Sequence, residues 1–98
     1  MTTGTSQEHE ALRRSAELLD AIGRRSPTST VALHSLTAAQ LLSTAGIHPD
    51  AHHGPLPSDR AALDQVLTQF ASVPTNLLRH ADLLEALHHA MLARIAAR

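Results

Sequence analysis

Four potential metal ligands lie within six residues of a stretch rich in proline and glycine: His48, Asp50, His52 and His53. Imidazole and carboxylate groups bind zinc, nickel, copper and iron, so this stretch could hold a metal ion. A specific site also needs fixed geometry and supporting groups around its ligands. Pro49 prevents a helix that would align His48 with His52. We therefore expect a solvent-exposed polar loop, with a metal site as the alternative.

A second candidate is the step Glu85-x-x-His88, which places both side chains on one face of a helix. Di-iron carboxylate bundles use this step together with further glutamates from other helices. The step occurs once in the chain, and only Glu8, Glu10 or Glu17 could complete the ligand set. We therefore expect Glu85 at the polar edge of its helix and His88 as a packed or interface histidine. A metal site at Glu85 and His88 is the alternative.

Other chemistries have little support in the composition. The chain has no cysteine, which excludes disulfides, thiolate metal sites and thiol nucleophiles. No G-x-S-x-G nucleophile motif occurs, and the four glycines are scattered instead of forming a phosphate-binding loop. A net charge of −1 and one aromatic residue, Phe70, argue against nucleic-acid binding. We expect no enzyme activity and no cofactor.

The cellular location is predicted from the absence of long apolar segments in the sequence. No run of about 18 apolar residues could cross a membrane, and the first 25 residues contain no apolar signal region. We therefore expect a cytoplasmic protein without a membrane partner.

The eight histidines suggest a response to pH. His34 lies in an uncharged segment, and His88 lies near the middle of the apolar arc of the last predicted helix. If such histidines are buried, the folded protein would lose stability as the pH falls through about 6. The alternative is that these are surface histidines with ordinary titration.

Apolar residues at helical spacing predict four elements to carry these groups. Thr5 and Ser58 fit helix N-caps, Gly46 fits a helix end, and Pro27 and Pro74 interrupt helices. We expect a flexible tail over residues 1–5 and a loop rich in Pro, Gly and His over residues 46–58. The predicted helices cover about residues 6–25, 29–45, 59–72 and 76–97.

The second predicted helix lies in a segment without charge. Residues 26–49 contain no Asp, Glu, Lys or Arg. A helix that is weakly apolar all round is either buried on several sides or part of an interface between chains. Two alternatives concern its boundaries: the helix could begin near residue 38, and residues 30–36 could form a short strand.

We expect one all-α domain over residues 1–98, a small four-helix bundle that is antiparallel in its simplest arrangement. A chain this short with almost no aromatic residues is marginally stable alone, which favours homo-oligomerisation. The predicted function is non-catalytic protein–protein interaction, as a small subunit, adaptor or regulator. The alternatives are a metal-binding bundle and, third, a DNA-binding regulator. The expected contact residues come from the second and fourth helices: Leu36, Leu41, Leu42, Leu84, His88 and Met91.

Overall fold

The computed structural model describes residues 3–25, 29–49, 54–73 and 81–97, and it confirms an all-α, four-helix protein. The helices are α1 (Thr3–Arg25), α2 (Thr30–Thr44), α3 (Asp59–Ala71) and α4 (Ala81–Ala96). The expected tail is partly helical, because α1 begins at Thr3, a few residues before the predicted start, and local patterns do not fix helix ends to the residue. The predicted start of the last helix, near residue 76, lies outside the described residues.

The boundaries of α2 and α3 follow from their capping residues. The Ser29 hydroxyl accepts a hydrogen bond from the Ala32 N–H at 3.0 Å, and the Ser58 hydroxyl accepts one from the Ala61 N–H at 3.2 Å. Each bond satisfies a backbone donor that the first turn leaves free. The alternative of a strand over residues 30–36 is therefore wrong, because the Ser29 cap allows the helix to begin directly after it.

The end of α2 uses the glycine expected there. Gly46 has a φ of 92°, a left-handed conformation that glycine adopts without steric cost. This turn lets the Ile47 N–H reach the Leu42 carbonyl at 2.8 Å and the Gly46 N–H reach the Ser43 carbonyl at 3.0 Å. Both bonds satisfy carbonyls at the helix end.

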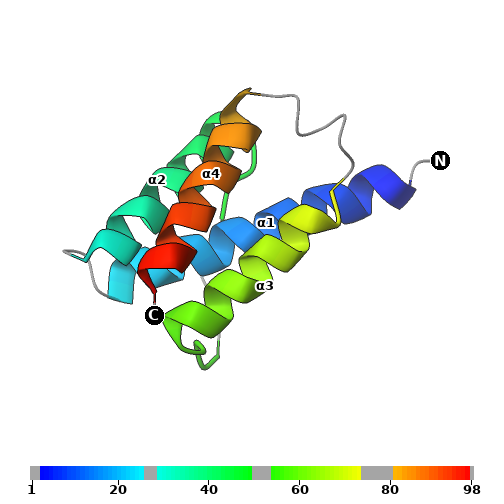
Figure 1. The fold of residues 1–98 in the computed structure, drawn as a ribbon. Coiled ribbons are helices and arrows are strands. Elements are labelled where there is room, and N and C mark those ends of the chain that lie inside the picture. Colours follow the sequence, from blue (N-terminus) through cyan, green and yellow to red (C-terminus); the bar gives the residue numbers. More distant parts are fainter. Residues whose placement is uncertain (1–2, 26–28, 50–53, 74–80, 98) are drawn as a thin grey trace.

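The helices form two antiparallel pairs that cross each other. Helices α1 and α3 lie side by side in opposite directions, as do α2 and α4 (Figure 1). The most extensive contact is between α2 and α4, followed by the contact between α1 and α2. Each helix thus packs against two neighbours. No described helix is both long and apolar enough to cross a membrane.

The core contains a few large side chains between helices that meet through alanine. Its largest fully buried apolar side chains are those of Phe70, Leu19, Ile22, Leu42, Leu63 and Val66. The buried face of α4 consists mainly of Ala86, Ala90 and Ala93. Short side chains at a contact allow helix axes to approach closely. Alanine therefore fills positions where larger apolar residues would hold the helices apart.

Candidate functional site

The outer face of α4 carries large apolar side chains. Leu84, Met91 and Ile95 are 48%, 49% and 72% exposed, and His88 is exposed between Leu84 and Met91. Their spacing of four, three and four residues puts all four on one stripe, which we call the α4 stripe. Leu83, Ala86, Ala90 and Ala93 of α4 are buried and face the other way, into the core. The centre of the predicted apolar arc is thus exposed, because alanine makes the helix contacts.

The candidate contact residues of α2 are placed differently. Leu42 is fully buried in the core, and Leu36 and Leu41 are half-buried. Leu42 cannot offer contact area to a partner without rearrangement of the core, so it is removed from the contact surface. The sequence pattern could not separate these leucines, because α2 is apolar on nearly every side.

Two histidines meet where α2 and α4 pack together. The Nδ1 atoms of His34 on α2 and His89 on α4 lie 3.0 Å apart, and the ring centroids are 5.3 Å apart with a 31° tilt. Both side chains are half-buried. The alanine contact beside them brings the helices close enough for the two rings to share a hydrogen bond. We call these residues the histidine pair.

His89 resists protonation more than an ordinary histidine. Its pKa is lowered from 6.5, first because burial removes water from the charged form and then because charges on His34 and His88 would repel it. Glu85, one turn before it on α4, acts in the opposite direction and raises the pKa. At neutral pH His89 is therefore neutral, and a neutral ring can donate to or accept from His34.

The candidate metal ligands do not come together among the described residues. His48 is exposed, and its Nδ1 lies 2.8 Å from the Ser43 hydroxyl. Its proposed co-ligands Asp50, His52 and His53 lie outside the described residues. Glu85 and His88 are both exposed on α4. Within the described part of the chain, no group of three or more His, Cys, Asp or Glu side chains could hold a metal ion.

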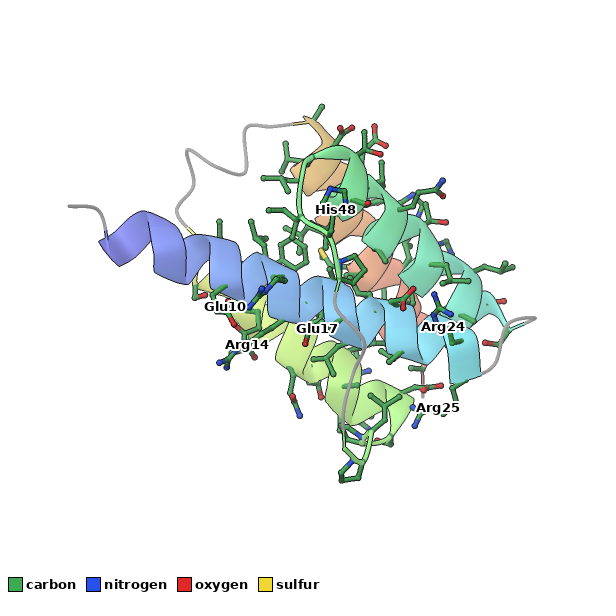
Figure 2. All side chains as sticks on the ribbon, turned by 180° about the vertical axis from the view of Figure 1, so that it is seen from behind. Glu10, Arg14, Glu17, Arg24, Arg25 and His48 are labelled. Atoms are coloured by element: carbon green, nitrogen blue, oxygen red, sulfur yellow. The ribbon has the colours of Figure 1, made fainter. Side chains whose placement is uncertain are left out.

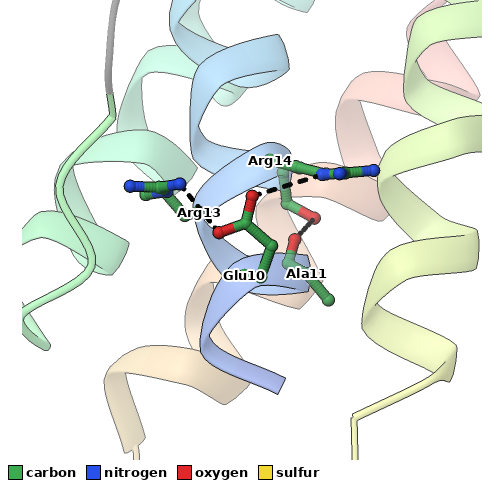
Figure 3. Close-up of polar contacts among 5 residues, drawn as sticks. Glu10, Ala11, Arg13 and Arg14 are labelled. Carbon is green, nitrogen blue, oxygen red and sulfur yellow. Dashed lines mark hydrogen bonds and ion pairs between the residues drawn. The ribbon is translucent and has the colours of Figure 1, made fainter. Parts of the chain in front are cut away.

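The polar face of α1 is a series of ion pairs. Glu10 accepts hydrogen bonds from Arg13 at 2.7 Å and from Arg14 at 3.5 Å, one on each carboxylate oxygen (Figure 3). Further along the same helix, Asp20 accepts one from Arg24 at 2.8 Å. Figure 2 shows Glu10, Arg14 and Arg24 at successive points along α1. The negative charge beside each arginine weakens a basic surface for nucleic acid.

Two arginines join helices that are far apart in the sequence. Arg25, at the end of α1, donates to the Asp59 carboxylate and to the Pro57 carbonyl at the start of α3. Arg94 on α4 donates to the Asp64 carboxylate on α3 at 2.6 Å. Pairs exposed to this degree contribute little to stability, about 1 kcal/mol or less.

A hollow of about 310 Å³ opens between the end of α1, α2 and the loop after α2. Asp20 is the titratable group among its lining residues, and it is already paired with Arg24. Its lining residues are Asp20, Leu36, Ala39, Gln40, Ser43 and Pro49.

Sequence reasoning missed the histidine pair. His34 and His89 are 55 residues apart, and nothing local to either residue indicates the other. The available signal was His34 itself, a titratable side chain in a segment without charge. No protein-family model matches the chain, and no curated protein or solved structure matches it significantly.

Proposed function

We propose that this protein acts through non-catalytic protein–protein contact, as a small subunit, adaptor or regulator, and that a second copy of the chain covers the α4 stripe. The observation that supports this is the row of exposed apolar side chains Leu84, Met91 and Ile95 on one helix face. Removing such surface from water is favourable by about 25 cal/mol per Å². Contiguous apolar surface on a folded protein commonly marks an interaction site.

The arrangement of the stripe favours a second copy as the partner. A two-fold contact requires a patch that is complementary to itself. The residue spacing of the α4 stripe is the same in both directions along the helix. In an antiparallel contact, Leu84 would face Ile95 of the second copy, and His88 would face Met91 of the second copy. The two His88 rings would then not lie opposite each other, so like charges would not oppose association.

The α2 leucines have a smaller part in this proposal. Leu36 and Leu41 are half-buried and can add only part of their surface to a contact. The main contact residues are therefore Leu84, His88 and Met91, with Ile95 added because it is the most exposed of the stripe.

The test is the mass of the protein in solution, measured by sedimentation equilibrium. We expect the unchanged chain to have a multiple of its 10.5 kDa mass. The double variant Met91→Glu/Ile95→Glu should have the mass of one chain, because charged side chains on the stripe would have to be desolvated on association. Both positions are exposed, so the variant should keep its helical circular dichroism spectrum.

Leu33→Glu is the matched control. Leu33 is 57% exposed but lies on α2, outside the stripe, so this variant should have the same mass as the unchanged chain. A mass of 10.5 kDa for the unchanged chain at every concentration would contradict self-association. Equal masses for the double variant and the unchanged chain would contradict the assignment to the α4 stripe.

A further inference from the structure

The histidine pair can hold a limited number of protons. With both rings neutral, one Nδ1 carries a hydrogen and donates it, and the Nδ1 of the other ring accepts it. The first added proton can bind Nε2 of the donor ring. That ring becomes an imidazolium and still donates from Nδ1, so the 3.0 Å contact is kept and strengthened.

The second added proton has a different effect. It must bind the Nδ1 atom that accepts the hydrogen bond, because the accepting ring already carries its hydrogen on Nε2. Two positively charged rings then face each other through N–H groups, with the Nδ1 atoms 3.0 Å apart. This state has lost its hydrogen bond and adds like-charge repulsion, so the rings must separate.

We propose that the histidine pair is a proton-operated joint between α2 and α4, which holds this edge of the helix contact closed with up to one added proton and opens it when both rings are protonated. The joint lies beside the most extensive helix contact of the fold. Separation of the rings therefore weakens the packing of α4 on α2.

The charged groups around the pair determine the pH at which it opens. Helix α2 contributes only His34, because residues 26–49 contain no acidic or basic side chain other than histidine. Helix α4 contributes His88, which opposes protonation of His89, and Glu85, which favours it. Asp82 lies on α4 seven residues before His89, on the same side of the helix.

The sign of the stability change follows from the direction of the shift. The pKa of His89 is lower in the folded chain than its ordinary value of 6.5, so the unfolded chain binds more protons below that pH. The contribution of a neutral His89 is therefore complete above about 6.5 and is lost as the pH falls from there through the lowered pKa of His89 in the folded state.

The test combines imidazole titration by NMR with thermal melts between pH 5 and 8. In the unchanged chain we expect the His89 ring to titrate below the ordinary histidine value of 6.5 and the melting temperature to fall as the pH falls below 6.5. His34→Gln removes one repelling charge, so His89 should titrate at higher pH. The melting temperature should then depend less on pH.

Two exposed neighbours provide variants with opposite effects. His88→Gln removes a repelling charge, so the joint should open at higher pH. Glu85→Gln removes the favourable charge, so it should open at lower pH. His48→Gln is the control, since His48 is exposed and bonds Ser43 instead of the pair.

Three results would overturn the proposal. One is titration of His89 at the ordinary histidine value or above it. Another is a pH dependence of melting that is the same with and without His34. The third is a shift in the same direction, or no shift, for His88→Gln and Glu85→Gln.

Discussion

Two buried serines on neighbouring helices differ in whether the hydroxyl group makes a hydrogen bond. Both Ser15 on α1 and Ser35 on α2 are fully buried. The Ser15 hydroxyl donates to the Ala11 carbonyl at 3.0 Å, whereas the Ser35 Oγ has no hydrogen-bond partner among the described residues. Burying an unsatisfied hydroxyl costs about 1–3 kcal/mol. At the residue scale, Ser35 therefore lowers the free energy of unfolding.

Ser35→Ala should stabilise the fold. Alanine removes the unsatisfied hydroxyl, leaves almost the same volume and has a higher helix propensity. We expect the free energy of unfolding to rise by about 1 kcal/mol, which corresponds to about 4–8 °C in melting temperature. Urea denaturation measures the change. Ser15→Ala is the matched control: it removes a satisfied hydroxyl and should give no comparable gain. Equal gains in both variants would mean that helix propensity alone is responsible.

At the scale of elements, the crossing of α1 and α2 depends on a glycine. A Cβ atom built at Gly23 would lie only 2.3 Å from the Leu36 Cγ, so a larger residue requires Leu36 to move. Overpacking of this kind costs about 1–3 kcal/mol. The Gly→Ala change in a helix interior gains about 1 kcal/mol. Over most of the range of about 1–3 kcal/mol, the cost of overpacking therefore exceeds the helix gain of about 1 kcal/mol.

Gly23→Ala should lower the free energy of unfolding by up to about 2 kcal/mol, which is the difference between these two effects. If contact with Leu36 is the cause, the same change should stabilise the chain in a Leu36→Ala background, where the helix gain remains and the obstruction is removed. A double-mutant cycle by urea denaturation measures this coupling. A destabilisation by Gly23→Ala that persists in the Leu36→Ala background would exclude the contact as its source.

The same scale shows what the sequence can predict. A local signal located the C-terminal end of α2, because Gly46 acts within one turn of the backbone, whereas the Ser29 cap was found only in the structure. Local signals could not find the buried face of α4, because the helix has leucines on both sides and its buried side consists mainly of alanine. The size of the side chains suggested Leu84 and Met91 as the centre of the face, and close helix packing selected Ala86 and Ala90 for the core. The His34–His89 contact depends on the same packing and is not local.

At the scale of the whole molecule, the four helices share a core with a single aromatic side chain. Phe70 is 1% exposed, and the other large core residues are leucine, isoleucine and valine. Native domains are stable by only about 5–15 kcal/mol, and short chains with small side chains fall near the lower end. One large core side chain is therefore a substantial part of the total.

Phe70→Ala should remove most of the stability of the isolated chain. Deleting a buried phenyl ring costs about 3–5 kcal/mol, because buried area and its contacts are lost and the cavity collapses only partly. We expect a strong decrease in the urea midpoint, with a measurable unfolded fraction at 37 °C. Phe70→Leu is the control, since it keeps most of the volume and should cost much less. If Phe70→Ala lowers the free energy of unfolding by no more than Phe70→Leu does, α1, α2 and α4 do not depend on α3 for their core. In that case the four helices do not unfold as one unit. We expect instead that Phe70→Ala causes a large loss of stability and that the helical circular dichroism signal of the whole chain disappears in one transition. This result would indicate that the single aromatic residue supports all four helices together.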